Sequence, residues 1–161
     1  MKDEPIPADL KAGDVAPVFS LPTAGGGHVK LRDLKGQVVV LFFYPKDDTT
    51  ACTQEALSFT EKAAEFASAG AVVIGISRDS VKSHDKFLAK HGLGVVLASD
   101  EDGAVCGQYG VWREKSMYGR KYMGIERSTF LINQKGKIVK TWRKVKVAGH
   151  PDDILASTRK L

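Results

Sequence analysis

Short runs of apolar residues alternate along the chain with longer segments in which apolar residues recur every third or fourth position. Continuous apolar runs are typical of strands buried on both faces, and the wider spacing is typical of amphipathic helices. Buried strands are predicted at 37–45 (QVVVLFFYP), 71–77 (AVVIGIS) and 95–99 (VVLAS). Two later strands are predicted at 127–133 (RSTFLIN) and 137–142 (KIVKTW). The pattern therefore predicts an α/β chain.

Helices are predicted in the segments that separate these strands. The first covers 49–69 and ends at Gly70, because glycine readily terminates a helix. Its apolar side is formed by Ala56, Phe59, Ala63 and Phe66. A second helix of about ten residues begins at Asp79 or Ser80, either of which can cap it, and ends near Gly92.

Turn residues locate the remaining elements. GGG at 25–27, between VFSL and HVKL, predicts an early hairpin with a flexible turn. QKGK joins the last two strands, with Gly136 at the reversal. Segment 100–110 is predicted as a short helix or turn, and 151–161 as a closing helix with Pro151 in its first turn.

Strands that alternate with helices, followed by a hairpin and a last helix, predict a three-layer α/β sandwich with a mixed central sheet. The order of elements is that of a thioredoxin-like fold with an N-terminal β-hairpin extension. We expect one domain over 1–161, because this length suffices for a single core, with 1–12 as an extended N-terminal segment. The CxxC motif of many thioredoxin-like redox proteins is absent.

Composition narrows the class of protein without identifying a function. With 43% hydrophobic and 27% charged residues, the chain resembles ordinary soluble proteins. The N-terminal MKDEPIPADLKAG has no apolar segment typical of a secretory signal, and the longest apolar run, VVVLFFY, is too short to cross a bilayer. We therefore expect a cytoplasmic protein with no membrane partner. Two cysteines argue against a disulfide framework and four scattered histidines against a metal site, so no metal or cofactor is expected.

Charge is unevenly distributed along the chain, whose net charge is +5. Residues 113–146 contain eleven Lys or Arg and two acids, whereas residues 1–112 carry a net charge of −4. A basic stretch of this kind can contact nucleic acid or an acidic protein partner. No aromatic interleaving or nucleic-acid motif accompanies these charges. We therefore interpret them as solvated strand edges and loops, and expect no nucleic-acid partner.

The stretch YPKDDTTACTQEAL (44–57) places Cys52 in the first turn of the helix that follows the first buried strand. Backbone N–H groups in a first turn lack partners and the helix dipole is positive there, so this position favours a thiolate. Thiolate stabilisation alone does not give an efficient catalyst, because nucleophilicity falls as the thiolate becomes more stable. A reactive site also needs groups that hold the electrophile and stabilise charge on the leaving atom.

Four residues are candidates for those groups. Thr49 can direct its hydroxyl and N–H toward the helix N-terminus, and Pro45 can shield the thiolate from water. Arg127 begins an apolar strand, where its guanidinium can contact the sulfur and donate to an oxygen, and Glu55 can orient that arginine. Each also has a structural interpretation: helix cap, strand terminator, solvated strand end and dipole-favoured acid. Their coincidence around Cys52 favours an active site.

At these residues the chain resembles the peroxiredoxins. Pro45-x-x-x-Thr49-x-x-Cys52 is similar to the PxxxTxxC signature, and Arg127 in ERSTFLI is similar to the active-site arginine of that family. GDVAPVFSL, VVLFFYPKDDT, SDEDGAVCGQYGVW and RSTFLINQKGKIVKTW resemble the bacterioferritin-comigratory, or Q-type, branch. The resemblance implies a peroxidase that reduces hydrogen peroxide and organic hydroperoxides. Cys52 would attack the peroxide, forming a sulfenic acid, while Thr49 and Arg127 hold the two oxygens.

The chain departs from the DDTPGCTxEAC pattern of many members of that branch. Thr50 replaces the proline, Ala51 the glycine, and Leu57 the second cysteine, which normally resolves the sulfenic acid. Another resolving position of the branch, around 87–89, has no cysteine either. Cys106 is then the remaining intramolecular candidate, but free cysteine is commonly a small buried apolar residue, and we favour this structural interpretation over a resolving role.

We therefore predict a one-cysteine mechanism, in which thioredoxin, glutaredoxin or glutathione reduces the oxidised Cys52. A two-cysteine mechanism with Cys106 as the resolving thiol is an alternative, and so is a thioredoxin-fold interaction module without peroxidase activity. A monomer is expected, because the branch that the chain resembles is often monomeric.

Overall fold

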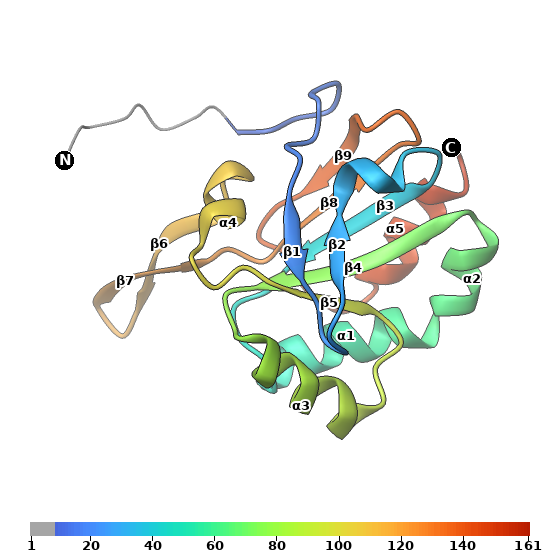
Figure 1. Ribbon diagram of the computed structural model, residues 1–161. Coiled ribbons are helices and arrows are strands. Elements are labelled where there is room, and N and C mark those ends of the chain that lie inside the picture. The colour runs from blue at the N-terminus through green and yellow to red at the C-terminus, as the bar shows by residue number, and fades with distance from the viewer. Residues whose placement is uncertain (1–8) are drawn as a thin grey trace.

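The computed structural model describes residues 9–161 and has a five-stranded mixed sheet at its centre (Figure 1). In spatial order its strands are β5 (Val96–Ser99), β4 (Ala71–Ser77), β3 (Val38–Phe43), β8 (Ser128–Ile132) and β9 (Ile138–Trp142). β3, β4 and β5 are parallel, whereas β8 runs antiparallel to β3 and β9 antiparallel to β8. The predicted mixed sheet is confirmed.

β3 divides the interior into two hydrophobic cores. All six of its residues are buried, and successive side chains of a strand point to opposite faces of the sheet. Val39, Leu41 and Phe43 therefore pack in one core, and the residues between them pack in the other. An uninterrupted apolar run is what such a central strand requires.

Different elements cover the two faces of the sheet. One core is completed by the helices α1 (Thr50–Glu61), α2 (Ala63–Ser68), α3 (Val81–His91) and α5 (His150–Thr158). The other is completed mainly by the hairpin β1 (Ser20–Pro22)–β2 (His28–Lys30), the 3-10 helix η1 (Leu31–Leu34) and α4 (Ala104–Gln108). The thioredoxin-like three-layer arrangement with its N-terminal hairpin is thus confirmed.

The prediction of a single helix over 49–69 is wrong in one respect: the helix is interrupted at Lys62. There the backbone leaves helical geometry (φ −104°, ψ 9°) between α1 and α2. The Thr60 hydroxyl donates to the Ala56 carbonyl at 2.7 Å and accepts from the Gly94 N–H at 3.0 Å. Back-bonding of this kind bends helices, and the contact with Gly94 depends on the tertiary fold.

The boundaries of the next helix follow the predicted caps. The Ser80 hydroxyl, rather than the Asp79 carboxylate, accepts the Ser83 N–H at 3.1 Å. Gly92 ends α3 in the left-handed conformation (φ 60°), which glycine adopts at little cost. At the end of the chain, Pro151 lies in the first turn of α5, as predicted.

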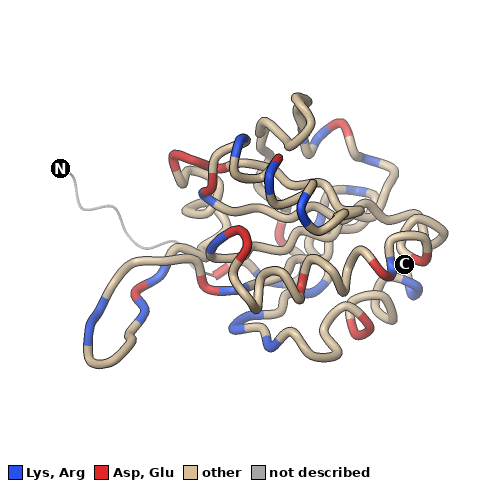
Figure 2. The backbone as a smooth tube through the Cα atoms, turned by 90° about the horizontal axis from the view of Figure 1, so that it is seen from below, with Lys and Arg blue, Asp and Glu red and all other residues tan. Residues whose placement is uncertain are grey.

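A second hairpin, β6 (Trp112–Met117)–β7 (Arg120–Ile125), was not predicted. Its strands pair antiparallel over six residue pairs and project from the body of the molecule (Figures 1 and 2). Eleven of its twelve strand residues are exposed or half-buried, so the sequence lacks the apolar–polar alternation that identifies a strand with one buried face.

Of the predicted N-terminal segment 1–12, residues 1–8 lie outside the described part of the chain, and 9–12 belong to no helix or strand. None of the helices within 9–161 is both long and apolar enough to span a bilayer.

Candidate active site

Cys52 lies in the first turn of α1, directly after the loop that follows β3. Thr49 occupies the N-cap position with extended backbone (φ −87°, ψ 157°), so the N–H groups of the next three residues have no carbonyl partner within the helix. Cys52 is the third of these residues. Its side chain is only 2% exposed and packs in the helix-covered core. Water therefore screens little of the positive end of the helix dipole at the sulfur.

Arg127 reaches Cys52 because β8 pairs with β3. Ser128, the first residue of β8, faces Phe43, the last residue of β3, and this register places Arg127 beside the loop that leads to α1. One guanidinium nitrogen, Nη2, lies 3.1 Å from the Cys52 sulfur, within hydrogen-bonding distance. The pairing of β8 with β3 therefore brings together two side chains that are 75 residues apart in the sequence.

Glu55 holds the other side of the same guanidinium. Arg127 Nη1 donates to Glu55 Oε1 at 2.6 Å, and the Glu55 side chain is completely buried one turn after Cys52. Burial raises the pKa of Glu55 to about 7, although Arg127 opposes this shift. Its second oxygen, Oε2, is buried without a hydrogen-bond partner, which makes the ionised form costly.

The charge of Arg127 is maintained in spite of its burial. Burial by itself lowers the pKa of Arg127, but the neighbouring Glu55 and Cys52 raise it above its ordinary value. The guanidinium is thus a fixed cation between two groups that can each become negative. Together the three side chains form a charged cluster with little exposure to water.

Thr49 and Pro45 lie on the same loop but have different surroundings. The Thr49 hydroxyl donates to the Lys46 carbonyl at 2.8 Å, so its proton is not directed at the sulfur. Thr49 is exposed, and its oxygen keeps lone pairs that can accept a hydrogen bond from a bound molecule. Pro45 is half-buried at the end of β3 and cannot donate a backbone hydrogen bond.

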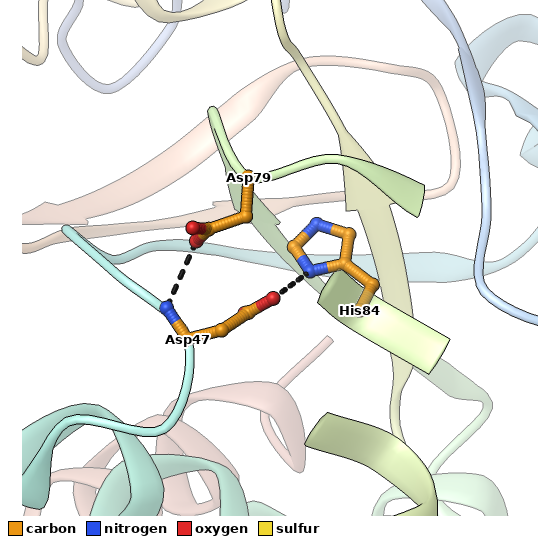
Figure 3. Close-up of side chains that lie close together, drawn as sticks. All are labelled: Asp47, Asp79 and His84. Atoms are coloured by element: carbon orange, nitrogen blue, oxygen red, sulfur yellow. Dashed lines mark hydrogen bonds and ion pairs between the residues drawn. The ribbon is translucent and has the colours of Figure 1, made fainter. Parts of the chain in front are cut away.

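The loop that carries Pro45 and Thr49 is attached to α3 through Asp47. The His84 ring, completely buried, has Nδ1 2.7 Å from Asp47 Oδ2 and Nε2 3.0 Å from the Ala98 carbonyl (Figure 3). A carbonyl can only accept, and the carboxylate accepts as well, so a ring protonated on both nitrogens satisfies both contacts.

Further hydrogen bonds complete this attachment. Asp47 also accepts from the Tyr44 hydroxyl at 2.6 Å and from the Ser83 hydroxyl at 2.8 Å. Its own N–H donates to Asp79 at 2.8 Å (Figure 3). Burial raises the pKa of Tyr44 well above its ordinary value, so this hydroxyl stays protonated and donates. The loop before α1 is therefore anchored by a buried polar network.

The next residue, Asp48, makes a second attachment to α3 at the surface. Its carboxylate accepts from Lys90 at 2.7 Å and lies 2.8 Å from His91 Nε2. These contacts lower the pKa of Asp48 below its ordinary value. Two consecutive aspartates thus join one loop to one helix, an arrangement that the sequence analysis missed. The signal was present, because His84 and His91 are two turns apart on the same side of a predicted helix.

The expectation that no metal site is present rested on sequence spacing alone, and the fold brings three potential ligands together. One nitrogen or oxygen atom from each of Asp47, Asp79 and His84 lies within 4.8 Å of the others. The carboxylates already accept hydrogen bonds from the protein, including one from the Ser77 hydroxyl to Asp79 at 2.6 Å. The network explains this cluster without an ion.

Cys106 lies apart from this site. It is fully buried in the core on the other face of the sheet from Cys52, and both cysteines are free. Burial, reinforced by a contact with Asp100, raises the pKa of the Cys106 thiol far above its ordinary value. A thiol in such an environment is a poor nucleophile.

Comparison with known proteins gives a consistent result. Residues 12–141 match the model of the AhpC/TSA family. The chain is 51% identical to peroxiredoxin Bcp of Xanthomonas campestris, over 89% of this chain and 91% of that protein. It is 50% identical to a putative peroxiredoxin bcp of Coxiella burnetii, over 91% and 97% of the two chains.

Solved structures agree with this grouping. Peroxiredoxin Q of X. campestris superposes with a TM-score of 0.84 at 50% identity, covering 88% of this chain and 90% of that one. A cysteine-to-serine variant of PrxQ from Xylella fastidiosa superposes with a TM-score of 0.90 at 40% identity, covering 96% and 98%. Another X. campestris structure concerns the alkyl peroxide reduction activity of its bacterioferritin comigratory protein.

The raised pKa of Glu55 predicts a pH-dependent stability. Its folded-state pKa of about 7 lies above the ordinary value of 4.5, so protonated Glu55 is favoured by folding. The resulting stabilisation is fully present below pH 4.5 and is lost as the pH rises through 7. At about 1.4 kcal/mol per pKa unit, roughly 3 kcal/mol of the free energy of unfolding should be lost.

Urea unfolding of the wild type and of Glu55→Gln, measured from pH 5 to pH 8, checks this expectation. As the pH rises, the wild type should lose unfolding free energy relative to Glu55→Gln. The comparison isolates Glu55, since the other titrating groups are common to both proteins. A pH-independent difference would contradict it.

The two attachments of the loop to α3 should differ greatly in energy. His84→Ala leaves the buried Asp47 Oδ2 without its ring N–H partner, and losing one partner of a buried polar group typically costs about 1–3 kcal/mol, more when that group is charged. Asp48→Asn removes an exposed pair, whose loss costs little because solvent screens it, and asparagine tolerates the left-handed backbone of that residue (φ 59°). Urea denaturation of the two variants measures both costs. Similar costs would show that the buried pair does not anchor the loop.

Proposed function

The chain belongs to the AhpC/TSA family and is a peroxiredoxin, a thiol-dependent peroxidase; from this premise we propose that Cys52 is the sulfur that reduces the peroxide. Catalytic roles for Arg127, Thr49 and Pro45, and a supporting role for Glu55, complete the proposal. The observation that carries it is the 3.1 Å contact between Arg127 Nη2 and the Cys52 sulfur.

In the proposed reaction, the Cys52 thiolate attacks the terminal oxygen of the peroxide and the O–O bond breaks. The sulfur gains that hydroxyl as a sulfenic acid, and the other oxygen leaves as hydroxide or alkoxide, which takes up a proton. Negative charge therefore moves from sulfur to oxygen. A guanidinium presents several N–H donors in one plane, so Arg127 can donate to the leaving oxygen while it remains beside the sulfur.

Thr49 and Pro45 would position the peroxide. The lone pairs of the Thr49 hydroxyl can accept a hydrogen bond from the peroxide O–H, because its own O–H donates to the Lys46 carbonyl. Pro45 would limit the access of water, which strengthens the electrostatic contacts inside the site. Glu55 would hold the guanidinium in place through its 2.6 Å contact.

We propose that the sulfenic acid is resolved by a separate thiol. Leu57 occupies the position of the family's nearby resolving cysteine, and Cys106 belongs to the core on the opposite face of the sheet. A Cys52–Cys106 disulfide requires Cα atoms within about 7 Å of each other, so one of the two cores would have to open. The buried Cys106 thiol is also protonated at neutral pH.

The remaining features are inferred from the resemblance to the Q-type branch. We expect hydrogen peroxide and organic hydroperoxides as substrates, and thioredoxin, glutaredoxin or glutathione as the reductant. A single peroxidase domain over 1–161, a monomeric state and a cytoplasmic location are likewise proposed. The coupled cluster around Cys52 gives no support to a non-catalytic interaction module.

Oxidation by one equivalent of peroxide tests the proposed function most simply. Without reductant, mass spectrometry should find one added oxygen on Cys52, because no thiol within the molecule resolves the sulfenic acid. Excess peroxide should carry Cys52 on to the sulfinic acid. Cys52→Ser should lose this reaction and all peroxide turnover with dithiothreitol, whereas Cys106→Ser should keep both.

Two results would contradict this account. Loss of two hydrogens with Cys52 linked to Cys106 would establish the two-cysteine alternative. Peroxide consumption with dithiothreitol that is no faster in the wild type than in Cys52→Ser would support the non-catalytic module.

A further inference from the structure

The hairpin surface, defined here as residues 112–125, gathers most of the large apolar side chains exposed by the described part of the chain. Five of the eight such residues in 9–161 belong to it. They are Trp112, Met117, Tyr118, Tyr122 and Met123. Aromatic residues and methionine are enriched in protein interfaces, and a cluster of them on one projecting element differs from the scattered apolar residues of an ordinary surface.

Positive charge accompanies these apolar side chains. The hairpin surface has four Lys or Arg and one Glu, a net charge of +3. Direct cross-strand partners share a face, so Lys115 and Tyr122 lie together, as do Met117 and Arg120. Alternation along β6 puts these two pairs on the same face. This face thus combines apolar side chains with cations, the composition expected of a surface that binds an acidic partner.

Tyr118 at the tip of the hairpin adopts an unfavourable backbone conformation. It is 98% exposed and has φ 51°, in the left-handed region, and is followed by Gly119 with φ 76°. Two residues with positive φ form the tight hairpin turn in which asparagine and glycine are preferred. A bulky residue there is strained, and a solvent-exposed tyrosine gains no packing in return. Such strain without an internal benefit is typical of a functional position.

The base of the hairpin lies beside the proposed catalytic loop. A cleft of about 470 Å³ has Pro45 and Lys46 on one wall and Lys115, Tyr122 and Met123 of the hairpin on another.

Arg78 attaches the base of the hairpin to the body of the protein. Its guanidinium stacks over the Trp112 ring at 4.5 Å and donates to the Glu101 carbonyl at 3.1 Å. A partner that binds along the hairpin down to its base therefore meets the loop that precedes Cys52.

We propose that the hairpin surface is the docking site of the reductant, a dithiol protein whose reactive thiol is surrounded by apolar and acidic residues. This inference rests on the proposed function, in which the sulfenic acid needs an external thiol. Cys52 is only 2% exposed, so the reductant must be oriented as it approaches. Tyr118 would be the apolar anchor at the tip, and Arg120 would pair with the partner's acidic groups.

The electrons for this step come from the two thiols of the partner. Its first thiolate attacks the Cys52 sulfenic acid, a mixed disulfide forms, and the hydroxyl leaves as water after protonation. Its second thiolate then attacks the partner's own sulfur in that disulfide. The partner leaves with an internal disulfide, and Cys52 returns as a thiolate. The partner loses two electrons, and the sulfenic acid gains them.

A protein fits this surface better than a small thiol does. A tripeptide such as glutathione can enter the cleft at the base, but it gives no reason for an exposed, strained tyrosine at the tip. A long, rigidly based hairpin with aromatic and Arg residues instead has the hot-spot composition of a protein interface. The charges favour an acidic protein over a neutral one, and they steer its approach.

Two variants separate docking from folding and catalysis. Tyr118→Asn removes the anchor but places a preferred residue at the turn, so the unfolding midpoint should be unchanged or higher. Arg120→Glu reverses one exposed charge. Lys135→Glu is the matched control, because it reverses an exposed charge in the turn at the other end of β8, on the edge of the sheet away from the catalytic loop.

Peroxide turnover is measured with thioredoxin or glutaredoxin, each with its regenerating system, and with dithiothreitol. With whichever protein dithiol reduces the wild type, kcat/KM should fall about tenfold or more in Tyr118→Asn and Arg120→Glu, mainly through KM. Lys135→Glu should match the wild type. All three variants should keep wild-type activity with dithiothreitol, and raising the salt concentration should increase KM for the protein dithiol.

Several results would overturn the proposal. These are unchanged kcat/KM for the protein dithiol in both hairpin variants, an equal loss with dithiothreitol, or a wild type that only small thiols reduce. A dimer of the wild type that becomes a monomer in the hairpin variants would assign the surface to a second copy of this chain instead. Failure of the proposed function is distinct, because the wild type would then lack turnover even with dithiothreitol.

Discussion

One largely buried guanidinium, that of Arg127, faces two groups that can each carry a negative charge. Its Nη2 lies 3.1 Å from the Cys52 sulfur and its Nη1 lies 2.6 Å from Glu55. A single cation can balance one of these charges fully but not both, because all three side chains are withdrawn from water. Burial raises the pKa of Glu55 to about 7, and the contact with Arg127 offsets only part of this shift. In the proposed mechanism, a neutral Glu55 would leave the arginine free to stabilise the thiolate and then the leaving oxygen.

The fold brings these side chains together through a small number of constraints. The pairing of β8 with β3 places Arg127 at the end of β3, and the helix that starts there carries both Cys52 and Glu55. The loop between β3 and α1 is attached to α3 by Asp47 in the interior and Asp48 at the surface. A loop anchored in this way can keep its conformation through the catalytic cycle. That fits a mechanism in which no cysteine of α1 has to leave the helix to form a disulfide.

Sequence reasoning recovered the features that depend on local pattern. The buried strands, the Ser80 cap and the early hairpin follow from periodicity and turn residues, and Cys52 was placed at a helix N-terminus for the same reason. It missed the break at Lys62 and the β6–β7 hairpin. The first depends on a hydrogen bond with a distant residue, and the second has no buried face that would give an alternating pattern. The pairing of Asp47 with His84 was likewise missed, since partners 37 residues apart become neighbours only in the folded chain.

The central claim is that Arg127 accelerates the attack of Cys52 on the O–O bond by a directed contact, beyond its effect as a nearby charge. Stopped-flow measurement of the second-order rate constant for Cys52 oxidation by hydrogen peroxide, in the wild type and in Arg127→Lys, tests it directly. Lysine keeps the charge but lacks the planar set of donors, so the rate constant should fall about 10²-fold, while alkylation of Cys52 by iodoacetamide changes far less. A lysine variant that reacts with peroxide as fast as the wild type would contradict the account.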